Sequence, residues 1–158
     1  TPGMEHRVGG LEKWEETGHV SYDPENHQKM VELRQQKVDV IANDIALAKA
    51  FGKGNGDLLV IGWGGTHGAL RSAVETAQEK GMSVSHLHLR HLNPLPRNLG
   101  EILVKFQKVM IAELNMGQLA AIIRSKFLVD AVSLNKIQGK PFTITEVFNK
   151  ITELVKGA

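Results

Sequence analysis

A glycine-rich loop is the first segment of this sequence whose residue types and spacing could do chemistry. Residues 62–68, GWGGTHG, follow the apolar run DLLVI and precede ALRSAVETAQEKG, which has helical spacing. A glycine loop between a strand and a helix can bind phosphate through its backbone N–H groups. A dinucleotide-binding loop needs glycines at its first, third and sixth positions. Gly62 and Gly64 fit this pattern, but His67 occupies the sixth position.

The end of the next strand gives a second indication about nucleotide binding. A dinucleotide site expects Asp or Glu there, whereas this sequence has Arg90, which could contact the 2′-phosphate of NADP. A small NADP-binding domain is therefore one alternative. The loop has no Gly-Lys-Ser/Thr, which a P-loop requires. We favour a structural interpretation, in which the glycines let a buried strand turn sharply into a closely packed helix.

A second loop, residues 113–118 (ELNMGQ), also leads into a predicted helix. In an open parallel sheet, ligands bind where neighbouring strands send their connections to opposite faces. If the strands at 58–63 and 108–114 are neighbours, both loops flank one crevice, which could hold a ligand or receive a partner's loop. The residues that we assign to this crevice or docking edge are Gly64, Gly65, Thr66, His67, Arg90, Asn93, Asn115, Gly117 and Gln118.

Several ionisable side chains could suggest a metal or catalytic site. His86 and His88 alternate along a predicted strand and so share one face. Zinc needs three or four protein ligands, and neither cysteine nor a carboxylate lies at ligand spacing here. We therefore interpret these histidines, with Arg90, as a polar contact surface. Glu12, Glu15 and Glu16 are acid/base candidates that we expect in a solvated loop, so we predict no catalytic residue and no metal site.

Composition limits the possible functions of the chain. Its 158 residues suffice for one ordinary domain, and its net charge of +2 without a dense Lys/Arg run gives no indication of nucleic-acid binding. No apolar run reaches about 18 residues, so no membrane span is predicted. Cysteine is absent, which excludes disulfides and cysteine-held clusters in this stretch and is compatible with the cytoplasm, where we expect the protein. The start Thr1-Pro2-Gly3 lacks Met, and we expect a piece of a longer protein, with a processed N-terminus as the alternative.

The elements that must position these loops follow from periodicity. Residues 1–22 are predicted to form an irregular arm, and residues 23–51 a connecting helix that begins at Asp23-Pro24. Residues 57–158 alternate strands with helices, which indicates an α/β domain of three layers with a mostly parallel sheet. The predicted strands are 58–63, 82–89, 108–114 and 130–135. The predicted helices are 66–80, 99–106, 118–128 and 145–156, the last with Thr143 and Glu146 in capping-box register.

Several phrases in order along the chain resemble a known family. They are HRVGGLEKWEETGHVSYDPENHQKMVELRQQKV, LLVIGWGGTHGAL, HLHLRHLNPLPRNLGEIL, AELNMGQLAAIIRSKFLVDA and LNKIQGKPF. Together they resemble the C-terminal part of the α subunit of 2-oxoglutarate:ferredoxin oxidoreductase, in the 2-oxoacid:acceptor oxidoreductase group. The resemblance covers nearly the whole chain. It implies the fold of a transketolase C-terminal domain, with five strands and one antiparallel edge strand, which we place before Asp57 or in the arm.

The resemblance also implies an activity for the complete enzyme. That family oxidatively decarboxylates a 2-oxoacid with thiamine diphosphate and magnesium, passes electrons through iron–sulfur clusters to ferredoxin, and transfers the acyl group to coenzyme A. We expect none of these cofactors to bind this domain. Its implied role is to dock with the upstream domains of its own subunit and with a β subunit in a hetero-oligomer, and the isolated chain should be inactive. The alternatives are the NADP-binding domain and a stand-alone interaction or regulatory module.

Overall fold

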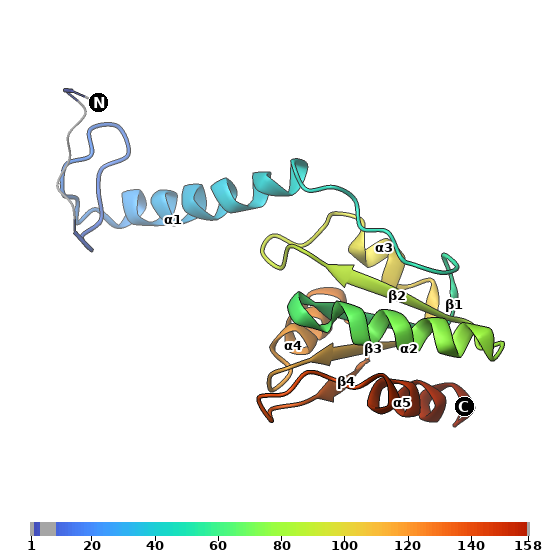
Figure 1. Cartoon of the computed structure of the whole chain (residues 1–158). Coiled ribbons are helices and arrows are strands. Elements are labelled where there is room, and N and C mark those ends of the chain that lie inside the picture. Colours follow the sequence, from blue (N-terminus) through green and yellow to red (C-terminus); the bar gives the residue numbers. More distant parts are fainter. Residues whose placement is uncertain (1, 4–8, 158) are drawn as a thin grey trace. The chain divides into compact units, whose positions relative to one another are not determined.

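The computed structural model describes residues 2–3 and 9–157, and the chain divides into two compact units, residues 1–44 and 45–158 (Figure 1). The first unit contains α1 (Pro24–Asp39) and a 3-10 turn, η1 (Val40–Asn43). The helix begins as predicted, because the Asp23 side chain accepts a hydrogen bond from the Asn26 backbone N–H and Pro24 occupies the first turn. Within the described residues, no helix is both long enough and apolar enough to cross a membrane.

The predicted continuation of this helix to residue 51 is wrong. It ends at Asp39, and residues 45–50 have no regular secondary structure. The Asn98 side chain explains this difference within the second unit, because its amide binds both backbone groups of Ala48. Asn98 accepts from the Ala48 N–H at 2.9 Å and donates to the Ala48 carbonyl at 2.9 Å. Ala48 and Ala50 also pack against the core, so tertiary contacts override the helical periodicity here.

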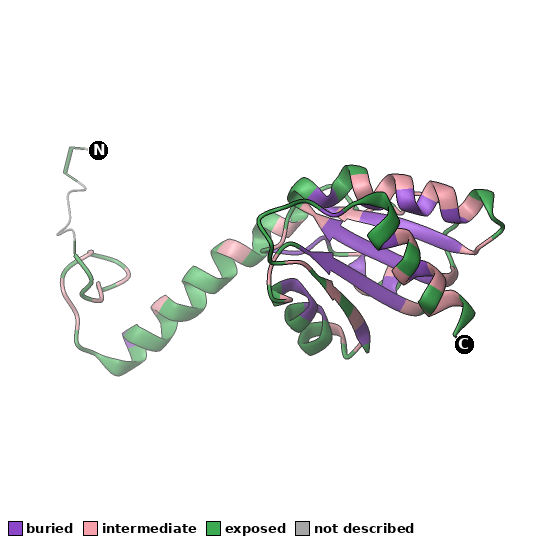
Figure 2. Ribbon diagram, turned by 60° about the horizontal axis from the view of Figure 1, so that its bottom comes forward, coloured by how far each residue is buried: buried purple, intermediate pink, exposed green. Residues whose placement is uncertain are grey.

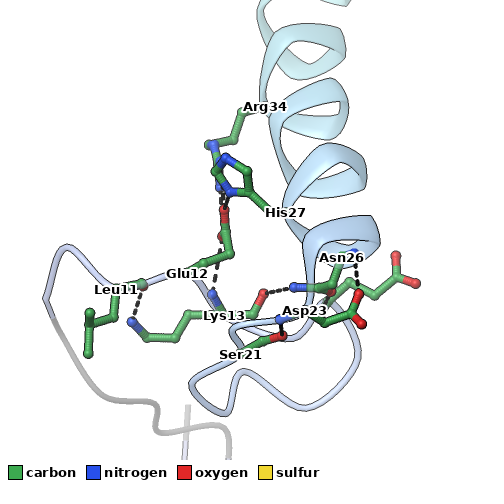
Figure 3. Close-up of polar contacts among 9 residues, drawn as sticks. Leu11, Glu12, Lys13, Ser21, Asp23, Asn26, His27 and Arg34 are labelled. Atoms are coloured by element: carbon green, nitrogen blue, oxygen red, sulfur yellow. Dashed lines mark hydrogen bonds and ion pairs between the residues drawn. The ribbon is translucent and has the colours of Figure 1, made fainter.

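Residues 9–22 of the arm turn back on themselves and contact the first turns of α1. Lys13 and Val20 form an antiparallel bridge, and the Trp14 N–H donates to the His19 carbonyl at 2.7 Å. Figure 3 shows that Asn26 joins this loop to the helix, since its side chain donates to the Lys13 carbonyl at 2.9 Å. Residues 4–8 of the predicted arm lie outside the described residues.

The second unit is built on a four-stranded sheet in which every pair of neighbours is parallel, in the order β2-β1-β3-β4. The strands are β1 (Gly56–Trp63), β2 (Val84–Leu89), β3 (Phe106–Glu113) and β4 (Ala131–Asn135). The helices are α2 (His67–Glu79), α3 (Leu99–Leu103), α4 (Gln118–Phe127) and α5 (Ile144–Lys156), with a short 3-10 turn, η2 (Gly64–Thr66), before α2. All four predicted strands and the four helices between and after them are therefore present, although α3 is shorter than predicted.

Helices cover both faces of the sheet, so the predicted three layers are present (Figure 1). One apolar cluster joins alternate residues of β1 and β3, such as Leu58 and Met110, to α2 and α5. The other cluster joins the intervening residues, such as Leu59 and Ile111, to α3 and α4. Figure 2 shows the consequence, with buried strands between helices whose outer faces are exposed. The predicted capping box of α5 is confirmed at Thr143 and Glu146.

The predicted fifth strand at an antiparallel edge is not found in the described residues. In its place Phe51 forms one isolated antiparallel bridge with His86 on β2, with hydrogen bonds of 2.7 and 2.9 Å. Gly52 follows with φ at +103° and turns the chain out of the extended direction. A Cβ atom at Gly52 would lie 2.7 Å from Ser85 Oγ, so this turn is held close against β2. The pairing therefore stops after one residue.

Candidate functional site

The predicted crevice lies where β1 and β3 end, side by side at the centre of the sheet. β1 leads into α2 on one face of the sheet, and β3 leads into α4 on the other. The adjacency on which the prediction depended is therefore confirmed. A hollow of about 230 Å³ lies between the two loops. It is lined by Trp63, Gly64, Gly65, Thr66, Leu114 and Asn115.

The contacts of Gly62 support the structural interpretation of the glycine loop. A Cβ atom at this position would lie 2.2 Å from Leu70 Cδ1 and 2.5 Å from Thr66 Oγ1. Only glycine therefore lets α2 approach β1 this closely. The next glycine, Gly64, has φ at +57° and forms the turn itself. The Thr66 hydroxyl closes this turn by donating to the Trp63 carbonyl at 2.9 Å.

Sequence reasoning missed Glu113, a fully buried carboxylate at the end of β3. It accepts hydrogen bonds from the backbone N–H groups of Leu119 and Ala120 at 2.9 and 3.0 Å, in the first turn of α4. It also accepts from Trp63 Nε1 at 3.2 Å and from Asn115 Nδ2 at 3.1 Å. The only signal in the sequence is an acidic residue at the end of an apolar strand, directly before a helix.

These contacts make Glu113 an anchor for both walls of the crevice. One carboxylate joins the loop after β1, through Trp63, to the loop after β3 and to the start of α4. Its negative charge also faces the positive end of the α4 dipole. Both oxygens already accept hydrogen bonds from protein donors. The arrangement therefore favours a positioning role for Glu113 over proton transfer to a substrate.

The remaining residues assigned to the crevice lie in other parts of the second unit. Gly117 forms the bend before α4 with φ at +94°, and its N–H donates to Asn115 Oδ1 at 2.7 Å. Gln118 begins α4 and also donates to Asn115, at 3.3 Å. Neither residue lines the hollow. Asn93 lies in the loop after β2, before a cis peptide bond to Pro94, and does not line the hollow either.

His67 and Arg90 line a different and larger hollow, together with His86 and His88. This position weighs against an NADP site in the crevice, because the basic residue that would contact a 2′-phosphate does not line it. Burial is the main reason that the pKa of His86 is lowered to about 4, and burial also lowers the pKa of His88. Among the described residues, no three histidine or carboxylate side chains are placed to hold a metal ion.

Comparison with known proteins identifies the family. Residues 56–147, which include all of β1 to β4 and the crevice, match the family described as pyruvate:ferredoxin oxidoreductase core domain II. The chain belongs to this family. The core domain II match includes both glycine loops and ends within α5.

Curated relatives of this chain match it beyond residues 56–147, the part that the family description covers. The 2-oxoglutarate oxidoreductase subunit KorA of Mycobacterium tuberculosis is 45% identical over 158 residues, which are 99% of this chain and 24% of the relative. The α subunit of 2-oxoacid:ferredoxin oxidoreductase 1 of Aeropyrum pernix is 30% identical over 90% of this chain and 24% of its own length. The chain thus spans about a quarter of the length of these curated relatives.

Solved structures agree with this assignment. The 2-oxoglutarate:ferredoxin oxidoreductase from Magnetococcus marinus, solved with 2-oxoglutarate, coenzyme A and succinyl-CoA bound, superposes with a TM-score of 0.88 at 29% identity. The match covers 98% of this chain and 27% of that one. A split-gene transketolase shares the fold with a TM-score of 0.54 at 14% identity, over 68% of this chain and 41% of its own. The expected likeness to transketolase is therefore confirmed at the level of the fold.

Proposed function

We propose that this chain is the C-terminal docking domain of the α subunit of a 2-oxoglutarate:ferredoxin oxidoreductase. The observation that carries the proposal is the match of 99% of the chain to 24% of a 2-oxoglutarate oxidoreductase subunit, at 45% identity. The complete enzyme would oxidise and decarboxylate the 2-oxoacid, form its acyl-CoA and reduce ferredoxin in the cytoplasm. The domain would contribute a rigid surface to this enzyme, and the isolated chain would not turn over substrate.

The chemistry of the crevice supports a docking role over cofactor binding. A diphosphate that binds together with magnesium is typically held by carboxylates on the metal ion and by basic side chains, and no residue that lines this hollow is acidic or basic. The crevice therefore does not fit the diphosphate and magnesium of thiamine diphosphate. Iron–sulfur clusters held by cysteine would also lie elsewhere, because the chain has no cysteine. We propose that thiamine diphosphate, magnesium and the clusters bind to other parts of the complete enzyme.

Exposed apolar side chains beside the crevice support a protein partner. Leu114 and Met116 follow β3 directly and are 40% and 77% exposed. Glu113 fixes the start of this loop and Asn115 fixes its bend, so the two apolar side chains extend from a rigid base. Apolar groups on a rigid loop are suited to bury area in a subunit interface. We propose that this edge contacts the upstream domains of the same subunit or a β subunit.

A chimeric enzyme tests this function. This chain would replace the matching quarter of the Mycobacterium tuberculosis relative, which would be co-expressed with the other subunit or subunits of that enzyme. We expect the chimera to co-purify with them and to reduce an electron-acceptor dye when supplied with 2-oxoglutarate. Failure to co-purify, although the chimera is folded, would contradict the docking role and would favour a stand-alone module.

A pair of matched variants localises the docking edge. Met116→Lys places a charge beside the crevice, whereas Val104→Lys places one after α3, at a side chain that is 76% exposed. The second site is a suitable control because it lies just before β3, at the opposite end of the strand. We expect Met116→Lys to weaken co-purification and Val104→Lys to leave it unchanged. Equal behaviour of the two variants would place the docking surface elsewhere.

A further inference from the structure

A second hollow, which the docking role does not use, lies between β2, the start of α2 and residues 46–51. Its volume is about 650 Å³, within the range of sites that bind small organic molecules. Histidines from two elements meet in it. The ring centre of His67 on α2 lies 5.7 Å from that of His86 and 4.8 Å from that of His88, both on β2. We call these three residues the histidine cluster.

His86 presents an unsatisfied polar atom to this hollow. The residue is only 2% exposed, and its Nδ1 lies 2.9 Å from the Val60 carbonyl oxygen. A carbonyl can only accept, so Nδ1 carries the proton and Nε2 is left as an acceptor in the neutral ring. This buried Nε2 has no partner, and the buried Nδ1 of His88 has none either. Buried polar atoms without a protein partner are rare in proteins, and ordered water, an ion or a bound group usually satisfies them.

The charge around the histidine cluster indicates the sign of a ligand that would bind there. Lys49, Arg71 and Arg90 line the same hollow, and no lining residue is acidic. The Arg71 guanidinium lies 3.1 Å from the ring centre of Phe51 and donates from Nε to Glu75 at 2.7 Å, which fixes its position. His67 is the first residue of α2, so the positive end of the helix dipole faces the same region. Each of these features favours an anion.

We propose that this hollow binds a small organic oxyanion, a carboxylate or a phosphate ester, with its charged group against the histidine cluster. Arg71 and Arg90 supply charge-assisted hydrogen bonds to such a group. Leu47, Phe51 and Pro96 supply apolar surface for an organic body. The proposal does not depend on the docking role, because none of these residues lines the crevice.

Binding of an anion here is coupled to proton uptake. The pKa of His86 is held down by burial, with further lowering from the positive charges of His67, His88 and Arg71, and Arg90 also opposes protonation of His88. An anion beside these rings favours their charged forms and raises both pKa values. The proton comes from solvent and binds at His86 Nε2, which then donates to the anion. Affinity therefore rises as pH falls, and the rise continues towards the pKa of His86 in the free protein, about 4.

Isothermal titration calorimetry of the full chain tests the proposal. The probes are phenyl phosphate, benzoate and inorganic phosphate, each in two buffers that differ in ionisation enthalpy, at about pH 6 and about pH 8. We expect an organic anion to bind with net proton uptake, and the phosphate and carboxylate arms to show which group is preferred. Weak inorganic phosphate binding beside tighter phenyl phosphate binding would confirm the contribution of the apolar wall.

Variants connect any binding to the proposed residues. Arg71→Gln and His88→Gln should each weaken binding by about fivefold or more, because each removes a donor to the anion. Lys126→Gln is the matched control, since Lys126 is an exposed basic residue on α4 and should leave binding unchanged. His86→Gln should reduce the proton uptake, because only His88 can then gain a proton. If it does not fold, the C2 proton shifts of the histidines in the unmodified chain report the same protonation on adding anion.

Three results would overturn the proposal. The first is that no anion gives heat or changes the histidine shifts at concentrations up to about 10 mM. An affinity below this limit would be too weak for a specific site. The second is binding that Lys126→Gln weakens as much as Arg71→Gln does, which would indicate non-specific attraction. The third is tight binding of Zn²⁺ to the histidine cluster without any effect of the anions, which would make it a metal site.

Discussion

The two units of this chain are stabilised in different ways. Residues 45–158 form two apolar clusters on either side of the sheet, and side chains such as Leu59 and Ile111 are completely buried. In the described part of residues 1–44, Asn26 alone is buried, and it is polar. There the contacts are ionic and hydrogen-bonded, and Glu12 is their centre. It accepts from both terminal nitrogens of Arg34, at 3.1 and 3.0 Å, and lies 2.8 Å from His27 Nδ1 (Figure 3).

This contrast shows which unit can fold by itself. Burying a large apolar side chain contributes about 1.5–3 kcal/mol, whereas an exposed ion pair contributes about 0–1 kcal/mol. The second unit therefore has the core of an independent domain. The first unit leaves Val31 and Leu33 of α1 46% and 42% exposed. Its order depends on a few polar contacts, which salt and acid weaken.

The largest difference between the two units is expected from matched truncations of apolar side chains. Leu59→Ala in β1 should lower the free energy of unfolding by about 2–5 kcal/mol, because it leaves a cavity in the core. Leu33→Ala in α1 should change it by about 0.5 kcal/mol or less. Urea denaturation followed by circular dichroism measures both values. Similar losses in the two variants would show that the first unit has a core of its own.

The next effect concerns the buried carboxylate. Glu113→Ala should lower the free energy of unfolding by about 2–4 kcal/mol, because the N–H groups of Leu119 and Ala120 lose their acceptor. Glu101→Ala, at an exposed position on α3, is the control and should have little effect. The same denaturation experiment compares them. A neutral Glu113→Ala would refute the anchoring role of this carboxylate.

A smaller effect is expected from the glycine loop. Gly62→Ala should lower the free energy of unfolding by about 1–3 kcal/mol, because its Cβ atom would overlap Leu70 and Thr66. Gly65→Ala is the matched control, since nothing lies within 4 Å of a Cβ atom there. Thermal unfolding measures the difference between the two variants. If both were equally tolerated, close approach of α2 to β1 would not be the reason for glycine at position 62.

The smallest effect is confined to the first unit and appears on acidification. Hydrogen bonds from Arg34, and next from His27, lower the pKa of Glu12 to about 2, from an ordinary value of 4.5. Because the folded pKa is the lower one, these contacts are fully stabilising above pH 4.5 and are lost as pH falls towards 2. The protection of the Lys13 amide against hydrogen exchange, taken relative to its intrinsic exchange rate at each pH, should fall over this interval while core amides of β1 stay protected. Arg34→Gln should move this loss of protection to higher pH.

Much of the second unit is predictable from the sequence, and the reason is local. Runs such as LLVI and VMIA give buried strands, and capping residues such as Thr143 mark helix ends. The irregular backbone of residues 45–50, where a helix is predicted, was not predictable, because Asn98 holds Ala48 from a position 50 residues away. The same is true of the fifth strand, which a single turn at Gly52 prevents.

The candidate site was predictable in position but only partly in composition. Parallel strands with loops that leave to opposite faces predict the crevice, and Gly64 and Asn115 do line it. His67 and Arg90 could not be placed correctly from the sequence, because the edge segment 46–51 creates a second hollow beside them. Glu113 was missed because its partners, Trp63 and α4, meet only in the folded sheet.

The central claim is that this chain is a folded domain whose chemistry is supplied by other parts of a larger enzyme. The most direct test is 2-oxoglutarate-dependent reduction of an electron-acceptor dye by the purified chain, with thiamine diphosphate, magnesium and coenzyme A added. A cooperative thermal transition in the same sample would confirm that it is folded. We predict no reduction above the rate of the mixture without protein. Sustained turnover by the chain alone would contradict the claim.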